Sequence, residues 1–204
     1  RRAQEFAKEV KEQMPDADII LLHSAFLMPD RAARERDLLQ KLGKRSTKAE
    51  RDHLIVIGTS VLEQSLDIDG DVMLTDLCPM DLLLQRLGRL HRHPIHDNMR
   101  PEQLKAAQCY VIEPDEDVFE SGTSCIYGDY LLMRTKKRLP DKITLPTDIP
   151  NLVQDCYDDR EPDLETEAEK EMYGKAKKKE ENKTGHKKTK ADSYCLDKPR
   201  RSLE

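Results

Sequence analysis

Apolar residues in the first half of the chain follow two patterns, one typical of helices and one typical of buried strands. Apolar side chains spaced by three or four residues predict an amphipathic helix at the start of the chain. The residues that carry this spacing are Ala3, Phe6, Ala7, Val10 and Met14. Short continuous apolar runs bounded by turn residues predict buried strands further along. These runs are PDADIILL, HLIVIGTS, DVMLTDL and AAQCYVIEP.

Helical stretches separate the predicted strands. In MPDRAARERDLLQKLGK, Pro29 suits a first helical turn and Gly43 suits a helix end. The stretch VLEQSLDIDGD predicts a loop or a short helix, and after Cys78-Pro79 we expect Asp81 to cap a helix over LLLQRLGRLHR. Strands that are apolar throughout and alternate with helices indicate an α/β fold, in which a parallel sheet carries helices on both faces.

The character of the chain changes after about residue 140. PDKITLPTDIPNLV carries prolines at intervals, which favours a strap or linker over a packed element. Residues 155–171 then hold nine Asp and Glu, and residues 175–190 hold eight Lys against two Glu. Segregated charge with few apolar residues is typical of a solvated helix or of disorder. We therefore expect one domain over residues 1–155, truncated at its start, and a charged, partly disordered C-terminal linker over 156–204.

Composition narrows the function classes. The 204 residues are 37% hydrophobic and 37% charged with no Trp, which suggests that part of the chain is not packed. The net charge of -5 gives no overall indication of nucleic-acid binding, so such binding would need local patches. No apolar run approaches the roughly 18 residues of a membrane span, and no secretory signal opens the chain. Five scattered cysteines without a CxxC pair favour free thiols in a reducing cytoplasm.

The stretch QRLGRLHRH at 85–93 suggests a binding site for an anion. A helix would place Arg86, Arg89 and Arg92 on one side, where like charges repel by a few tenths of a kcal/mol per pair. An external anion would offset that cost; a solvated helix face is the alternative. Thr59, where a strand gives way to a helix start, offers a hydroxyl and free backbone N–H groups to a phosphate, or simply caps the helix. Both stretches are expected beyond the carboxyl ends of adjacent strands, where open parallel sheets bind ligands.

These residues carry a resemblance to a known family. GTSVLEQSLDID resembles motif V of superfamily 2 helicases, and QRLGRLHR resembles motif VI. The EQSLD variant, with the later YLLMRTKKRLPDKITLPTDIP, makes residues 1–155 similar to the second RecA-like domain of the helicase–nuclease of type I CRISPR systems. LLHSAF resembles motif IVa, although Ala25 stands where the family form carries arginine, which puts a backbone contact there in doubt.

The resemblance implies a role for each matching residue. Arg92 is expected to be an arginine finger with Arg89 as its partner, and Gln85 to place the attacking water or contact the γ-phosphate. Asp67 is expected at the nucleotide ribose. An arginine suits the charge that develops on a transferring phosphoryl group, and can contribute a thousandfold or more in rate. Nucleic-acid contacts are expected from Thr59, His23 and Ser24.

The resemblance also implies a whole enzyme larger than this stretch. It would be an ATP-dependent, 3′-to-5′ single-stranded DNA translocase with nuclease activity, recruited by an RNA-guided surveillance complex to foreign DNA. ATP and Mg²⁺ would be bound mainly by a first RecA-like domain of the same polypeptide, and nuclease metal ions only by its nuclease domain. The present sequence shows no Walker loop, since LGKRST at 42–47 has Leu38 at the place of the first glycine. Lacking an acidic box too, the chain alone is expected neither to hydrolyse ATP nor to cut DNA.

Three further readings remain open. His91, His93 and His96 are spaced closely enough for a metal site, but Pro94 breaks the helical spacing, so we expect two or three neutral surface histidines and no metal. The lysines at 175–190 would track phosphates or simply solvate a linker. The chain would alternatively belong to another superfamily 2 helicase acting on DNA or RNA, or be a non-catalytic interaction module. The EQSLD variant argues against the former, and loss of ATPase activity on changing Arg92 would exclude the latter.

Overall fold

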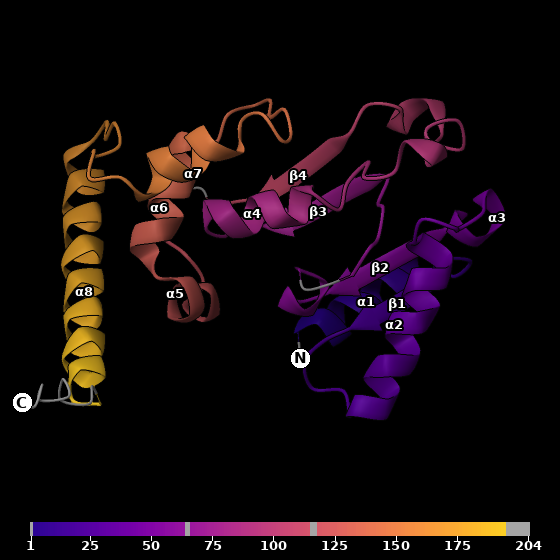
Figure 1. Ribbon diagram of the computed structural model, residues 1–204, viewed down its shortest axis with the longest axis horizontal. Helices are drawn as coiled ribbons and strands as arrows, with labels where there is room; N and C mark the ends of the chain where they lie inside the picture. The colour runs from indigo at the N-terminus through magenta and orange to yellow at the C-terminus, as the bar shows by residue number, and fades with distance from the viewer. Residues whose placement is uncertain (1, 64–65, 115–117, 195–204) are drawn as a thin grey trace, which may run out of the picture. The chain divides into compact units, whose positions relative to one another are not determined.

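The computed structural model describes residues 2–63, 66–114 and 118–194 (Figure 1). Within these residues the strands are β1 (Asp18–Leu22), β2 (Leu54–Gly58), β3 (Val72–Asp76) and β4 (Gln108–Ile112). The longer helices are α1 (Arg2–Gln13), α2 (Met28–Leu42), α4 (Met80–Leu87), α6 (Asp129–Arg138), α7 (Ile149–Tyr157) and α8 (Glu167–Asp192). The shorter ones are α3 (Lys48–Arg51), α5 (Ser121–Tyr127), η1 (Ser60–Glu63), η2 (Pro94–His96) and η3 (Glu102–Leu104).

The chain divides into two compact units. The first comprises residues 1–112 with 144–149, and the second comprises residues 113–143 with 150–204. These units do not coincide with the division expected near residue 155, because α6, which we placed in the first segment, packs against α8. The division into a helicase domain and a linker therefore remains a prediction about function rather than a description of packing.

All four predicted strands form, and they pair in parallel as two separate pairs. In the first pair Asp18 lies opposite Leu54, and in the second Val72 lies opposite Gln108. The mixed α/β class with short parallel strands flanked by helices is confirmed. However, we expected the strands before the two motifs to be neighbours. That expectation is wrong for the described residues, since β2 pairs with β1 and β3 pairs with β4.

The main core of the first unit lies between the β1–β2 pair and α2. Alternate strand residues Ile20 and Leu22 point into it, where Leu38 of α2 is fully buried. Helix α1 contacts the same two strands. Residues just after β2 complete this core, namely Val61, Leu66 and Ile68. The predicted arrangement, with helices on both faces, thus holds for β1–β2, which Figure 1 shows with α2 lying along it.

The β3–β4 pair is covered differently. Its partner α4 buries Met80, Leu83 and Leu84. One face of the pair stays exposed to solvent, so helices on both faces were wrongly expected for this pair. In parallel register the apolar side chains of that face are Val72, Leu74, Tyr110 and Ile112.

Helix α4 is shorter than predicted and begins differently. Its first residue is Met80 with Pro79 at the N-cap, so Asp81 lies in the first turn and does not cap the helix. It ends at Leu87, with Gly88 as the C-cap, rather than continuing to Arg92. The following residues instead join Gly70 in a parallel bridge at Leu90, and His91 adopts a φ of 47°. The three arginines therefore do not form a row on one helix face.

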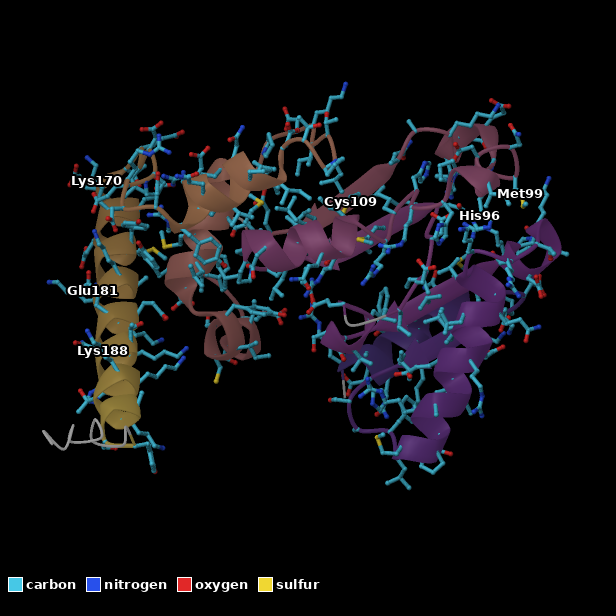
Figure 2. All side chains as sticks on the ribbon, in the orientation of Figure 1. His96, Met99, Cys109, Lys170, Glu181 and Lys188 are labelled. Carbon is cyan, nitrogen blue, oxygen red and sulfur yellow. The ribbon has the colours of Figure 1, made fainter. Side chains whose placement is uncertain are left out.

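The second unit is helical over its described residues. Residues 149–153 of the expected strap lie in α7, which buries Cys156. Of the two readings of the lysine-rich stretch, the structure shows a helix: α8 packs Tyr173 and Ala176 into a small core with Met133 of α6. Beyond Glu180, α8 is exposed through Ala191, as its labelled side chains Glu181 and Lys188 illustrate in Figure 2.

A buried arginine joins the helices of the second unit. The side chain of Arg134 is 1% exposed. It donates to the carbonyl oxygens of Cys156 (2.5 Å) and Asp158 (2.7 Å) and to the Tyr173 hydroxyl (2.9 Å). These acceptors come from α7, the residue that follows it and α8. One guanidinium therefore organises the unit, which the local sequence pattern did not predict.

Cys78, Cys109, Cys125 and Cys156 are free, as expected, while Cys195 lies outside the described residues. Over the described residues, no helix is both long and apolar enough to cross a membrane.

The free thiols are expected to differ sharply in reactivity. Burial raises the pKa of the Cys78 thiol to about 12, whereas Cys125 is exposed on α5. Because the thiolate is the reactive form, iodoacetamide at pH 8 should alkylate Cys125 on the order of a thousand times faster than Cys78. Peptide mapping by mass spectrometry over a time course measures this ratio. Comparable labelling of both residues in the folded protein would contradict the burial of Cys78.

Candidate functional site

The predicted anion-binding arginines lie on a loop that we call the arginine loop, residues 88–93. The backbone N–H of Gly70 donates to Arg89 O at 2.7 Å, and the N–H of His91 donates to Gly70 O at 3.0 Å. The loop therefore lies at the amino end of β3, and its expected place beyond the carboxyl end of β3 is wrong. Helix α4 causes this: its eight residues span roughly 12 Å and carry the chain back along a strand of roughly 16 Å.

The arginine loop nevertheless lies beside the segment that follows the carboxyl end of β2. Arg89 Nη2 donates to the carbonyl oxygen of Glu63, the last residue of η1, at 3.2 Å. The two motifs recognised in the sequence are thus brought together through η1 rather than through neighbouring strands. Gln64 and Ser65 of the EQSLD variant lie outside the described residues.

Arg92 and Asp67 form an exposed ion pair. Arg92 Nε donates to Asp67 Oδ1 at 2.7 Å, and Arg92 Nη1 donates to Gly88 O at 3.1 Å. The side chains are 40% and 53% exposed, respectively. An exposed pair of this kind contributes only about 0–1 kcal/mol, so a ligand with several charged oxygens would displace it at little cost. The pairing also places side by side the two residues expected at the triphosphate and at the ribose.

Arg89 lacks a carboxylate in hydrogen-bonding contact within the described residues. Among those residues Arg89 Nη2 donates to the Glu63 carbonyl, whereas its buried Nε–H has no hydrogen-bond partner. Burial, and next the positive charge of Arg92, lower the pKa of Arg89 below its ordinary value. Two neighbouring guanidiniums, one of them poorly compensated, would be stabilised by an anion placed against both.

Arg86 has a structural role. Its Nε donates to Glu63 Oε1 at 2.8 Å, and its Nη1 donates to Thr75 Oγ1 at 2.6 Å. The side chain of Glu63 is only 8% exposed, so this pair links η1, α4 and β3 in a partly buried position. The expected pairing of Arg86 with an acid is what the structure shows. The solvated helix face is excluded for this arginine.

Gln85 is exposed on α4, one residue before Arg86 and within the last turn of the helix. The exposed position leaves its amide accessible to a ligand, and its assigned contact with water or the γ-phosphate remains a prediction.

The three predicted nucleic-acid contacts gather at the carboxyl end of the β1–β2 pair. Thr59 follows β2, while His23 and Ser24 follow β1, and the Thr59 N–H donates to Leu22 O at 3.2 Å. This corrects our expectation of free N–H groups at Thr59, because its amide continues the strand pairing. The Thr59 and Ser24 side chains are exposed, which keeps their hydroxyls accessible.

His23 is held in place by its surroundings. Its Nδ1 accepts from the Ala25 N–H at 3.2 Å, and its ring stacks on Phe26 with centroids 4.1 Å apart. Gln4 Nε2 lies 3.1 Å from His23 Nε2. The imidazole is therefore mainly a structural support for the turn after β1, and a direct contact to nucleic acid remains a prediction.

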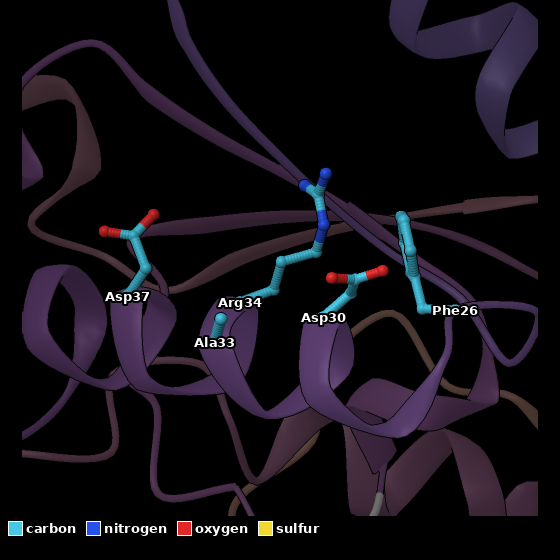
Figure 3. A pocket seen from close by; sticks show the side chains of 5 residues that line it. All are labelled: Phe26, Asp30, Ala33, Arg34 and Asp37. Carbon is cyan, nitrogen blue, oxygen red and sulfur yellow. The ribbon is translucent and has the colours of Figure 1, made fainter.

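A hollow of about 370 Å³ lies beside that turn, on α2 (Figure 3). Arg34 covers the Phe26 ring at 4.4 Å and stands with Asp30 and Asp37 on either side of it. Sequence reasoning missed this guanidinium, which lies eight residues from Phe26. With one Arg against two Asp, the lining has a formal charge of -1, so the hollow does not favour a phosphate.

The three histidines after the arginine loop are not all surface residues. His96 is completely buried, and His93 Nε2 lies 3.1 Å from Asp67 Oδ1. At most two of the three can therefore be surface histidines. The burial of His96 (labelled in Figure 2) is made possible by the buried Asp69 carboxylate, whose Oδ2 lies 2.5 Å from His96 Nδ1. Among the described residues, no group of three or more His, Cys, Asp or Glu side chains is arranged to hold a metal ion.

Sequence reasoning also missed the residues beneath the arginine loop. Asp69 and Arg100 are buried and pair with each other at 2.8 Å, although they lie 31 positions apart. The acidic run from Asp67 to Asp71 gave a partial signal, since three acids in five residues seldom stay uncompensated. Nothing local identified Arg100 as their partner.

Comparisons with known proteins agree with the motifs. Residues 1–95 match the family model described as CRISPR-associated nuclease/helicase Cas3, C-terminal. A CRISPR-associated nuclease/helicase Cas3 from Streptococcus thermophilus is 46% identical over 98% of this chain, which spans 21% of that relative's length. The chain therefore corresponds to about a fifth of this curated relative.

Solved structures show the same similarity. A crystal structure of T. fusca Cas3 with AMPPNP matches 86% of this chain at 31% identity with a TM-score of 0.71. The match covers 21% of the T. fusca chain. A CRISPR RNA-guided surveillance complex, described as pre-nicking, contains a chain that matches 85% of this one at 32% identity with a TM-score of 0.69; 22% of that chain is covered.

Proposed function

Because this chain belongs to the Cas3 family of CRISPR-associated nuclease/helicases, we propose that its arginine loop completes the ATPase site of a single-stranded DNA translocase. The observation that carries the proposal is the pair Arg89 and Arg92, of which one is poorly compensated and the other is held by an exposed, weak ion pair. Such a pair is suited to receive the oxygens of a triphosphate presented by another domain of the whole protein.

In this proposal each residue around the pair contacts a different part of the nucleotide. Arg92 exchanges the Asp67 carboxylate for phosphate oxygens, which frees Asp67 to accept a hydrogen bond from the ribose. Arg89 adds a second positive charge, and the exposed amide of Gln85 orients water. ATP is proposed as the nucleotide, supported by the similar crystal structure of T. fusca Cas3 with AMPPNP. Mg²⁺ would accompany it, bound mainly by the first RecA-like domain.

The carboxyl end of the β1–β2 pair is proposed to contact single-stranded DNA. The exposed hydroxyls of Thr59 and Ser24 lie on the two segments that leave neighbouring strands, so a phosphate backbone could be contacted by both. Ala25 stands where the family motif carries an arginine, and Arg34 of α2 lies over the Phe26 ring beside this turn. We therefore expect these contacts to be few and to rely on hydroxyl groups.

The whole protein is proposed to act with an RNA-guided surveillance complex and to move 3′-to-5′ along foreign DNA while a nuclease domain of the same polypeptide cuts it. A chain similar to this one occurs in a structure described as such a complex. The nuclease metals would lie in that other domain. This chain supplies the arginine loop and part of the DNA contact, and by itself is expected to be inactive as an ATPase and a nuclease.

Two substitutions in the whole protein test the division between the nucleotide and DNA contacts. Gln85→Ala should lower the DNA-stimulated ATP turnover number about a hundredfold with DNA affinity unchanged, because it removes a group that positions water. Thr59→Val should weaken single-stranded DNA binding about five- to tenfold with turnover at saturating DNA retained, because one hydrogen bond is lost. ATP hydrolysis assays and fluorescence anisotropy measure the two effects.

Matched controls for this pair are Gln103→Ala and Thr144→Val, which change exposed residues away from both stretches. Both should behave as the unaltered protein. If Gln85→Ala weakened DNA binding and left turnover intact, the assignment of α4 to the nucleotide would be wrong. If neither substitution changed either measurement, the chain would be better described as a non-catalytic interaction module.

A further inference from the structure

The arginine loop rests on a buried cluster of charged residues that the proposed function does not use. The cluster comprises Asp69, Asp71, Arg51, His96 and Arg100, and we call it the Asp69 cluster. Arg100 Nη2 lies 2.8 and 3.0 Å from the two carboxylate oxygens of Asp69, and Arg100 also contacts Asp71. The side chains of Asp69, His96 and Arg100 are at most 1% exposed.

The charges inside the cluster balance. Two guanidiniums, Arg51 and Arg100, face two carboxylates, Asp69 and Asp71, with Arg51 Nη2 at 2.6 Å from Asp71 Oδ1. Burial alone would raise the pKa of Asp69, but hydrogen bonds from His96, Arg100 and the Arg92 backbone outweigh it and lower that pKa below its ordinary value. Asp69 is thus a carboxylate at neutral pH, and the charges of the two arginines and the two carboxylates cancel.

The cluster is connected to Arg92 through the backbone. Asp69 Oδ1 accepts the Arg92 N–H at 2.7 Å. Because α4 ends at Leu87, this amide lies outside any helix and Asp69 provides its acceptor. The neighbouring Gly70 pairs with the backbone of Arg89 and His91, and the carbonyl of Asp71 lies 3.1 Å from His91 Nε2.

The arginine loop needs such support because its backbone is strained at His91. His91 adopts a φ of 47°, in the left-handed region, where a residue with a side chain costs on the order of 1 kcal/mol. A conformation of that kind persists only where surrounding contacts hold it. Segment 69–71 provides those contacts on one side of the loop, so the position of the Arg92 Cα depends on where the Asp69 carboxylate is fixed.

We propose that Asp69, held by Arg100 and His96, is a positioning residue that fixes Arg92 for the triphosphate. This inference rests on the proposed function, since it assigns Asp69 an effect through Arg92. A shift of about 1 Å in a catalytic group can cost up to a hundredfold in rate, so a loosened cluster should lower kcat while the fold survives. A purely structural ion pair would instead change the stability of the fold, and its effect on kcat would not depend on the presence of Arg92.

The test is a double-mutant cycle on DNA-stimulated ATP hydrolysis by the whole protein, using Arg100→Lys and Arg92→Ala. Arg100→Lys keeps the charge and loses the planar fork by which Nη2 contacts Asp69 and Nη1 contacts Asp71. It should lower kcat about tenfold, with KM for ATP and single-stranded DNA affinity within about twofold. In the Arg92→Ala background it should lower kcat no further, because the residue through which it acts is gone.

A second variant tests the same positioning role in case Arg100→Lys does not fold. His96→Asn keeps an N–H donor near the Asp69 carboxylate, and should give a smaller decrease in kcat with the same dependence on Arg92. Arg36→Lys, on the exposed face of α2, is the matched control and should leave kcat unchanged. Circular dichroism and the melting temperature show whether each variant is folded.

The outcomes separate the two levels of the proposal. If Arg92→Ala lowers turnover but Arg100→Lys and His96→Asn lower it equally in both backgrounds, or not at all, the positioning role is overturned while the proposed function stands. If Arg92→Ala leaves turnover unchanged, both are overturned. A tenfold effect of Arg100→Lys that disappears in the Arg92→Ala background supports both.

Discussion

The whole protein with Arg92→Ala is expected to hydrolyse ATP about a thousandfold more slowly at saturating DNA. The guanidinium of Arg92 is 40% exposed and permanently charged, and it pairs with the exposed carboxylate of Asp67, so the substitution removes a cation that is available to the triphosphate. Single-stranded DNA affinity should stay within about twofold, because the proposed DNA contacts lie at the carboxyl end of the β1–β2 pair.

Two further variants sharpen this result. Arg92→Lys keeps one positive charge and should restore part of the rate, since a lysine cannot reproduce the planar fork. Arg36→Ala removes an exposed arginine of α2 and should change neither turnover nor DNA binding. Steady-state hydrolysis with and without DNA, together with anisotropy for binding, provides the measurements. Full activity of Arg92→Ala would contradict the proposed site and favour an interaction module.

Arg134→Met is expected to destabilise the second unit by on the order of 3 kcal/mol. The guanidinium satisfies several buried acceptors at once, including the carbonyl oxygens of Cys156 and Asp158 and the hydroxyl of Tyr173. Methionine fills similar volume but leaves these acceptors without donors. Hydrogen exchange followed by mass spectrometry should show faster exchange across α6, α7 and the first half of α8.

Arg160 offers a matched control, because it pairs with the same Asp158 from an exposed position. Its side chain is 71% exposed, whereas that of Arg134 is 1% exposed. Arg160→Met should therefore leave exchange in α6–α8 nearly unchanged. Equal effects of the two substitutions would show that the ion pair with Asp158, rather than the buried hydrogen bonds of Arg134, holds the unit together.

The local pattern of apolar residues was sufficient to predict helices and strands whose structure depends on one segment of the chain. The strands β1 to β4 form at the continuous apolar runs, since each run needs only to be buried. Helix α2 starts with Pro29 in its first turn and ends before Gly43, as those residues predicted. The end of α4 was misjudged because apolar spacing continues through Leu90, while Gly88 and the bridge to Gly70 end the helix at Leu87.

The candidate site shows the same division. Motif spacing identified Arg89, Arg92, Asp67 and Thr59, and the structure brings Arg92 against Asp67, although their catalytic roles remain predictions. Motif spacing could not locate the arginine loop at the amino end of β3, because that location depends on the length of α4 and on backbone hydrogen bonds to Gly70. Nor could it find that His96 is buried, since its burial requires a carboxylate 27 positions away.

The order of apolar and polar residues by itself determined the α/β class, the strands and the residue types available to bind an anion. Only the tertiary structure decided which charges remain available. Arg86, Arg89 and Arg92 are alike in the sequence, yet Glu63 compensates the first, a carbonyl oxygen contacts the second and an exposed Asp67 holds the third. The physical reason is that the compensation of a charge depends on burial and on partners from distant segments, which periodicity along the chain does not specify.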